Sequence, residues 1–157
     1  MEILLLVVGK TGIGYVKEGI TEYCNRLKRY VPFSILEIPD IKGSKGLSQA
    51  QQKEKEGIEI LSKLTPADNV VLLDEHGKLY TSIEFSNVLQ RLMATGRKRI
   101  VFVVGGPYGF SEAVKNRADS LLSLSKMTFN HEMVRLFFTE QIYRAMTILR
   151  GEPYHHE

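Results

Sequence analysis

Groups suited to proton transfer gather at the C-terminal end of the chain. Residues 154–157 read Tyr-His-His-Glu, so a phenol, two imidazoles and a carboxylate follow one another. Groups of these types exchange protons near neutral pH. Upstream, Glu140 and Arg144 have the spacing of an ion pair on one side of a helix. The pattern indicates acid–base chemistry, or else a frayed tail beside an ordinary surface ion pair.

Two glycine-rich segments are candidates for ligand-binding turns. Residues 9–14, GKTGIG, lack the earlier glycine of a phosphate loop, because position 4 is Leu4. The third glycine position of the dinucleotide fingerprint falls on Lys17, so the segment indicates a plain strand-to-helix turn. Residues 105–111, GGPYGFS, directly follow an apolar run, where parallel sheets bind ligands. Adjacent glycines would let a ligand approach the backbone, so we predict either a binding loop or a tight, ligand-free turn.

A third candidate is the segment 121–129, LLSLSKMTF. It begins like a strand and then loses the periodicity of both helix and strand, with hydroxyl groups on Ser123, Ser125 and Thr128. An irregular segment after a buried strand is typical of a binding loop. A serine-rich edge strand is the alternative.

Short apolar runs alternate with amphipathic segments along the whole chain. The strand candidates are residues 3–8, 33–38, 70–73, 100–104 and 121–124. The helix candidates are residues 16–30, 58–64 after a capping box at Ser48 and Gln51, 85–92 after a box at Thr81 and Glu84, 114–121 capped by Ser111, and 131–150 capped by Asn130. This alternation predicts one α/β domain over residues 1–157, with a mainly parallel sheet flanked by helices.

The last of these helices is apolar around more of its circumference than the others. Its apolar residues between Val134 and Leu149 cover more than a single stripe. Such a helix is either packed in the centre of the domain or buried against a second copy of the chain.

Composition excludes several classes of protein. Of the 157 residues, 43% are hydrophobic and 25% charged, which is ordinary for a globular domain and excludes disorder. With one cysteine, Cys24, there is no internal disulfide and no thiol cluster for a metal, so we expect a reducing compartment and no metal site. No apolar stretch approaches the roughly 20 residues of a membrane span, and no signal peptide is evident, so we expect a cytoplasmic protein.

The charge balance favours no partner strongly. Lysine and arginine total 21 and aspartate and glutamate 18, a formal net charge of +3. Basic residues cluster at 26–29, 42–45 and 97–99. These clusters indicate either a solvated surface or weak patches for the phosphates of structured RNA.

Several motifs in a fixed order resemble one known family. They are Leu73-Asp74 at a strand end, GGPYG at 105–109, LSLSKMTFNHEMVR at 122–135, EQIYRA at 140–145 and PYH at 153–155. Over essentially the whole chain they resemble ribosomal RNA large subunit methyltransferase H, a family of the SPOUT class of S-adenosylmethionine-dependent methyltransferases. The resemblance implies a C-terminal deep trefoil knot, a homodimer, and methylation of N3 of a pseudouridine in 23S rRNA on the assembled ribosome.

The resemblance also assigns site residues. It places the S-adenosylmethionine contacts at Leu73, Gly105, Leu124, Ser125, Lys126, Met127, Thr128 and Phe129. It places catalytic groups at His155, Arg144, Tyr154 and Glu140, and substrate contacts at His131 and Arg144. His155 is the expected proton acceptor, or else Arg144 stabilises the uracil anion, and the tail is expected to act near the cofactor of the other subunit.

Two alternatives from other classes remain. The first is a nucleotide- or phosphate-binding domain that uses the glycine-rich turns at 9–14 and 105–109 without chemistry. The second is a ribosome-associated protein that has the fold and lacks methyl transfer.

Overall fold

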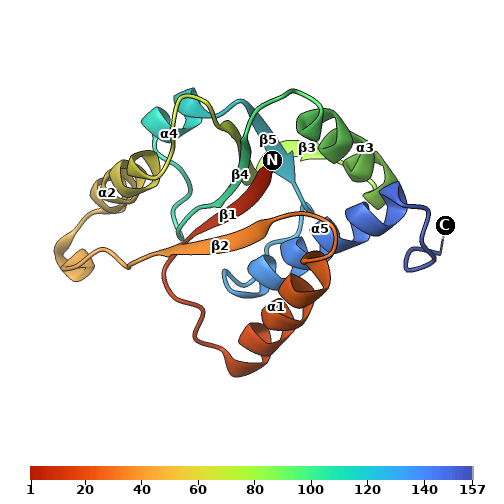
Figure 1. The fold of residues 1–157 in the computed structure, drawn as a ribbon. Helices are drawn as coiled ribbons and strands as arrows, with labels where there is room; N and C mark the ends of the chain where they lie inside the picture. Colours follow the sequence, from red (N-terminus) through yellow and green to blue (C-terminus); the bar gives the residue numbers. More distant parts are fainter. Residues whose placement is uncertain (157) are drawn as a thin grey trace.

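A computed structural model describes residues 1–156 and contains one five-stranded sheet (Figure 1). All neighbouring strands are parallel, in the order β2-β1-β4-β3-β5, which confirms the predicted parallel sheet. The strands are β1 (Glu2–Val8), β2 (Phe33–Ile38), β3 (Asn69–Leu79), β4 (Arg99–Val104) and β5 (Ser120–Ser123). β3 is longer than predicted, because a register shift after Leu73 lets Lys78 and Leu79 pair again with β5.

Helices cover both faces of this sheet (Figure 1). They are α1 (Gly14–Leu27), α2 (Gln49–Ser62), α3 (Ser82–Met93), α4 (Glu112–Arg117) and α5 (Met133–Leu149). Alternate strand residues pack into two separate cores, one on each face of the sheet. Leu5 and Phe102 belong to the core under α1, α3 and α5, whereas Leu4 and Val101 pack toward α2 and α4. Burial on both faces explains why β1 and β4 are nearly continuous hydrophobic runs.

The predicted helix start signals are present. The Ser48 and Thr81 hydroxyls accept hydrogen bonds from the N–H groups of Gln51 and Glu84, each at 3.1 Å, and both capping boxes are complete. α5 begins at Met133 rather than at residue 131, and its N-cap residue is Glu132, not Asn130 as predicted. Asn130 Oδ1 nevertheless accepts hydrogen bonds from the N–H groups of Glu132 and Met133, at 2.9 and 3.2 Å. These caps satisfy N–H groups that the first helical turn leaves without partners.

α5 owes its broad apolar surface to a central position. It packs against both α1 and α3, and the rings of Phe138 and Phe102 lie 4.8 Å apart under the sheet. Phe137, at 43% exposure, is its one large hydrophobic side chain classed as exposed among the described residues. The helix is therefore a core helix, and its broad apolar surface by itself gives no evidence for a partner.

After β5 the chain crosses one edge of the sheet. The segment 124–132 leaves β5 and reaches the turn after β1, where Glu132 contacts Gly12. It therefore passes over the carboxyl ends of β3 and β4, which lie between β5 and β1 in the sheet. This crossing builds one wall of the cleft described below.

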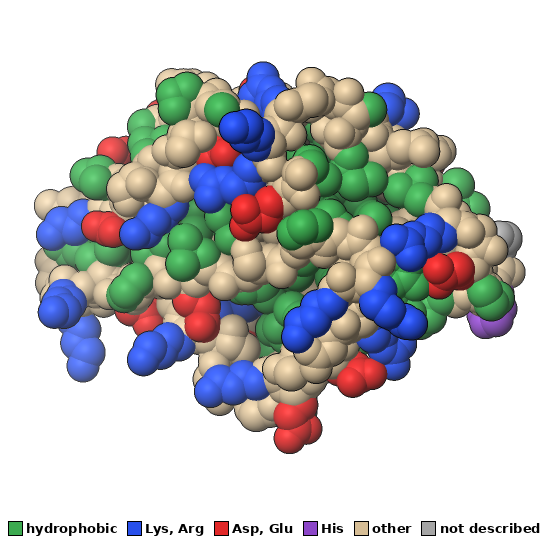
Figure 2. All heavy atoms as spheres, in the orientation of Figure 1, with side chains coloured by type: hydrophobic (Ala, Val, Ile, Leu, Met, Phe, Trp, Pro, Cys, Tyr) green, Lys and Arg blue, Asp and Glu red, His purple; other side chains and the backbone are tan. Residues whose placement is uncertain are grey.

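The surface is mixed in charge. On the face drawn in Figure 2, lysine and arginine side chains are scattered among acidic and apolar ones, as the small net charge suggests. Across residues 1–156, no helix is long and apolar enough to cross a membrane.

Candidate functional site

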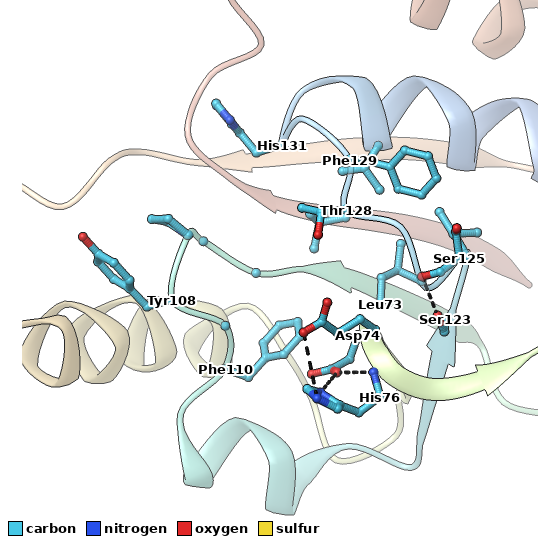
Figure 3. A pocket seen from close by; sticks show the side chains of 18 of the residues that line it. Leu73, Asp74, His76, Tyr108, Phe110, Ser123, Ser125, Thr128, Phe129 and His131 are labelled. Atoms are coloured by element: carbon cyan, nitrogen blue, oxygen red, sulfur yellow. Dashed lines mark hydrogen bonds and ion pairs between the residues drawn. The ribbon is translucent and has the colours of Figure 1, made fainter.

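A cleft of about 890 Å³ lies at the carboxyl ends of β4 and β5 and beside the middle of β3, where the pairing of β3 with β4 ends at Leu73 (Figure 3). Its walls include these parts of the strands, the loop 105–110, the loop after β5 and the start of α5. This is the edge at which parallel sheets bind ligands, and the volume suits a cofactor-sized molecule. The residues that line it are Gln49, Lys53, Leu73, Asp74, Glu75, His76, residues 104–110, Lys115, residues 123–125, residues 127–131 and Val134.

The residues that the resemblance assigns to the cofactor converge on this cleft. Seven of the eight line it: Leu73, Gly105, Leu124, Ser125, Met127, Thr128 and Phe129. The exception is Lys126, which is exposed and lies outside the lining. Three chain segments far apart in sequence thus form one cavity.

Hydrogen bonds shape the loop after β5. Ser123 donates from its hydroxyl to the carbonyl of Ser125 at 3.0 Å, and the Ser125 hydroxyl accepts from the N–H of Met127 at 2.9 Å. These short-range bonds replace strand pairing, so the segment is irregular, as the sequence predicted. Thr128 is exposed and faces the cavity (Figure 3).

The paired glycines of the second loop work differently from the sequence expectation. A Cβ at Gly105 would lie 3.0 Å from the buried ring of Phe110, and one at Gly106 would lie 2.3 Å from a carboxylate oxygen of Glu56. Both missing side chains therefore make room for the protein beneath the loop, while the two glycines also line the cleft. Gly109, with φ of +83°, closes the turn and donates to the Gly106 carbonyl at 3.2 Å.

Further polar groups enter the cleft that sequence reasoning missed. Asp74 Oδ1 lies 2.8 Å from the N–H of His76 and 2.9 Å from its ring Nδ1 (Figure 3). The sequence signals for them are the Leu73-Asp74 motif and their position directly after the apolar run that ends at Leu73. His131, the expected substrate contact, is exposed at the opposite wall.

The N–H groups of the first glycine-rich turn, residues 9–14, bind carboxylates of the protein itself. The N–H groups of Gly12 and Ile13 donate to Glu132 at 2.6 and 2.8 Å, and the N–H of Thr11 donates to Glu37. Hydrogen bonds from Ile13 and Gly12 keep the pKa of Glu132 below its usual value. A phosphate at this turn would have to displace Glu132, so the structure supports the interpretation as a strand-to-helix turn.

A buried arginine completes the same turn. The Arg135 guanidinium donates to the carbonyls of Gly9 and Val8 at 2.9 and 2.8 Å and to the Thr11 hydroxyl at 2.9 Å. Arg135 is 1% exposed, and burial lowers its pKa against the opposing charge of Glu37. The turn is thus tied to the start of α5.

The C-terminal candidates form a second polar cluster. Arg144 donates to Glu140 Oε1 through Nε and NH2, at 3.0 and 2.7 Å, and its NH1 lies 3.0 Å from His155 Nδ1. The Tyr154 hydroxyl donates to the same Glu140 oxygen at 2.9 Å and lies 3.2 Å from the hydroxyl of Tyr23. The structure therefore brings all the predicted catalytic residues together.

This environment keeps two members of the cluster protonated. Burial raises the pKa of Tyr154, and its hydrogen bonds to Tyr23 and Glu140 raise it further. Burial opposes the charge of Arg144, but the hydrogen bond and charge of Glu140 outweigh it and raise the pKa of Arg144. Tyr154 is thus a hydrogen-bond donor and Arg144 a fixed cation.

Within one chain this cluster is far from the cleft. Val134, on the first turns of α5, lines the cleft, and Arg144 lies about 15 Å further along the helix axis at roughly 1.5 Å per residue. None of the described tail residues, 154–156, lines the cleft. One copy of the chain therefore does not bring the two groups of predicted residues together.

One basic cluster has a structural role. Arg99 pairs with the buried Asp68 at 2.7 Å, and Arg97 donates to the Asp68 carbonyl at 2.7 Å. Their charges hold the connection before β3, so residues 97–99 offer less free charge than the sequence suggested. Among residues 1–156, no group of acidic, histidine or cysteine side chains could hold a metal ion.

Comparison with known families agrees with the fold. A family model described as predicted SPOUT methyltransferase matches residues 1–155. The chain therefore belongs to the SPOUT family of methyltransferases.

Curated relatives narrow the similarity. Proteins named ribosomal RNA large subunit methyltransferase H from Parabacteroides distasonis and Porphyromonas gingivalis are 63% and 57% identical to this chain over 157 residues, with full coverage of both chains. They confirm the resemblance stated from the sequence motifs. A solved structure of a probable methylase family protein from Haemophilus influenzae shares the fold, with a TM-score of 0.52 and 11% identity over 99% of this chain and 70% of that chain.

Proposed function

We propose that this protein transfers a methyl group from S-adenosylmethionine to N3 of a pseudouridine in 23S rRNA on the assembled ribosome. The observation that carries the proposal is the convergence of the loops 105–110 and 123–131 on one cleft at the strand ends. Membership of a methyltransferase family and the names of the relatives support the same reaction.

The residues of the cleft fit this cofactor. Apolar side chains such as Leu73, Leu124 and Phe129 suit a flat base, and the loop backbones with Ser125 and Thr128 suit its polar groups. When bound, S-adenosylmethionine supplies an electrophilic methyl group on a sulfonium. The protein has to hold that group in line with the nucleophile and to exclude water.

The tail cluster accounts for the proton that N3 carries. His155 is suited to accept that proton, and Arg144 is suited to stabilise the uracil anion that its removal creates. Glu140 fixes the direction of the Arg144 guanidinium through two hydrogen bonds. Tyr154 acts as a positioning residue, because its raised pKa keeps the hydroxyl a donor.

The distance between cluster and cleft supports a homodimer in which each tail serves the cleft of the other subunit. A second hollow of about 250 Å³, lined in part by Tyr80 and Phe137, adjoins the cleft and shares Ser123, Leu124 and Phe129 with it. Met127, at 79% exposure, extends the apolar surface beside the cleft. A partner would cover these apolar side chains, of which Met127 and Phe137 are exposed and the others half-buried in a single copy.

The rim of the cleft suits an RNA substrate. Lys53 and Lys115 line it, and Lys126 is exposed on the adjoining loop. Lysines at these places can contact backbone phosphates while one base reaches the cofactor. A ribosomal substrate implies a cytoplasmic location. The crossing segment 124–132 is in keeping with the trefoil knot that the family resemblance implies, within a single domain.

Titration calorimetry tests the cofactor assignment. We expect the wild-type protein to bind S-adenosylmethionine and not ATP, and Thr128→Arg, which fills the cleft from an exposed position, to lose that binding. Binding of ATP in its place would favour a phosphate-binding domain. Unchanged S-adenosylmethionine affinity in folded Thr128→Arg would contradict the proposed site.

A further inference from the structure

A buried carboxyl lies beneath the cleft, outside every group assigned above. Glu56 of α2 is 3% exposed. Its Oε2 accepts a hydrogen bond from Gln52 Nε2 at 3.1 Å, whereas its Oε1 is buried with no hydrogen-bond partner among the described residues. A buried carboxyl oxygen without a partner costs stability, so its retention calls for a role.

The carboxyl lies directly against the second glycine of the cofactor loop. A Cβ at Gly106 would sit 2.3 Å from Oε1 and 2.6 Å from Oε2, closer than any real side chain could approach. The next residue of α2, Gly57, meets the other end of the same loop, because a Cβ there would lie 2.4 Å from the Ser111 hydroxyl. Consecutive residues of α2 therefore support both ends of the segment 105–111.

We propose that Glu56 is a positioning residue of the cofactor cleft: its carboxyl, packed under Gly106, fixes the backbone path of residues 105–106 that faces the cofactor. The inference rests on the proposed function, since it concerns the same cleft. Glu56 does not line the cleft, so it acts through the loop.

The support that Glu56 gives the loop is by packing, because both carboxyl oxygens lie against the position that a Gly106 side chain would take. Burial raises the pKa of Glu56, the hydrogen bond from Gln52 opposes that shift, and the charge of Asp40 adds to it. Gln52 is on the same helix as Glu56, and Asp40 follows β2. A glutamine, which has nearly the same shape as glutamate, should therefore support the loop nearly as well as the native side chain.

A double-mutant cycle on cofactor affinity tests the inference. We expect Glu56→Ala to weaken S-adenosylmethionine binding about tenfold, with KM for the cofactor raised and kcat at saturation within about twofold. Glu56→Gln should stay within about threefold of wild type. Gly106→Ala should also weaken binding about tenfold, because its new methyl group meets Glu56. The double variant should lose less than the product of the single losses, because Glu56→Ala empties the space that the methyl group needs.

Glu54→Ala changes an exposed glutamate of the same helix and is the matched control, with affinity expected to be unchanged. Folded Glu56→Ala with wild-type affinity, or single losses that multiply in the double variant, would overturn the inference. If Glu56→Ala does not fold, wild-type affinity in Gly106→Ala would overturn it. A wild-type protein that binds no S-adenosylmethionine would instead refute the proposed function.

Discussion

Arg144 is held from two sides, by Glu140 along α5 and by His155 from the tail. The ring of Tyr154 also lies 4.8 Å from its guanidinium carbon. Charge-assisted bonds to one carboxylate fix the plane of the guanidinium, so its remaining donors point in a set direction. Such a fixed cation can stabilise an anion without reorganising when the charge develops.

Substitution of Arg144 separates its charge from its geometry. We expect Arg144→Ala to lower single-turnover methyl transfer by about 10²–10³-fold at saturating cofactor, as for the loss of one preorganised donor. Arg144→Lys keeps the charge but loses the bidentate bond to Glu140, so it should recover only part of the rate.

Tyr154→Phe serves as the comparison, because the hydroxyl donates and does not accept the proton. The single-turnover rate of Tyr154→Phe should fall by less than about tenfold. Wild-type rates in Arg144→Ala would return the cluster to a structural role.

Single residues also show where sequence reasoning reached its limit. The spacing of Glu140 and Arg144 predicted their ion pair, whereas only the family resemblance grouped them with His155. The purpose of Gly105 was not, because the ring of Phe110 that excludes a side chain there is identified only by the fold. Glu132 is similar: nothing in the sequence predicts that this carboxylate caps the turn after β1.

At the scale of elements, the C-terminal tail is docked rather than frayed. Tyr154 packs edge-on against Tyr143 of α5 with ring centroids 4.7 Å apart. The Tyr30 hydroxyl donates to Glu152 at 2.5 Å, and the Arg150 guanidinium lies 4.4 Å from the Tyr30 ring. A tail held by such contacts contributes to the stability of the fold as well as to the cluster.

Removal of residues 154–157 should therefore lower stability, against the general expectation for chain ends. We expect the free energy of unfolding to fall by about 1–3 kcal/mol, mainly through the lost packing of Tyr154. Denaturant unfolding of the truncated chain measures the change. His156→Ala, at an exposed position, should leave stability unaltered. An unchanged midpoint after truncation would show that the tail contacts contribute nothing.

Element positions followed from the sequence because their signals are local. Alternating hydrophobic runs and the capping boxes at Ser48 and Thr81 predicted the strands and helix starts. The strand order was not predictable, because the chain passes other strands of the sheet on its way from β2 to β3 and from β4 to β5. The broad apolar face of α5 had two physical explanations, and only the contacts with α1 and α3 decided between them.

For the whole molecule, a tail that serves the cleft of the other subunit requires two copies of the chain. A dimer of 17.8 kDa chains has a mass of about 36 kDa. Sedimentation equilibrium at micromolar concentration should find this species, and an 18 kDa species alone would contradict it.

Complementation tests whether the two copies share each site. Thr128→Arg disables the cleft and His155→Ala the tail, so each variant alone should be inactive. In a co-expressed mixture, mixed dimers carry one intact cleft opposite one intact tail. We expect about a quarter of wild-type activity if subunits pair at random. No recovery, with mixed dimers demonstrated, would mean that each chain uses its own tail.

The proposed function depends on methyl transfer by this cleft to one position of large-subunit rRNA. The most direct measurement is single-turnover transfer of labelled methyl from S-adenosylmethionine to ribosomes that lack the modification, with the labelled nucleotide mapped. We expect one labelled pseudouridine, methylated at N3, with the wild-type protein and no label with Thr128→Arg. Ribosome binding without label, or label at another atom or another RNA, would contradict it.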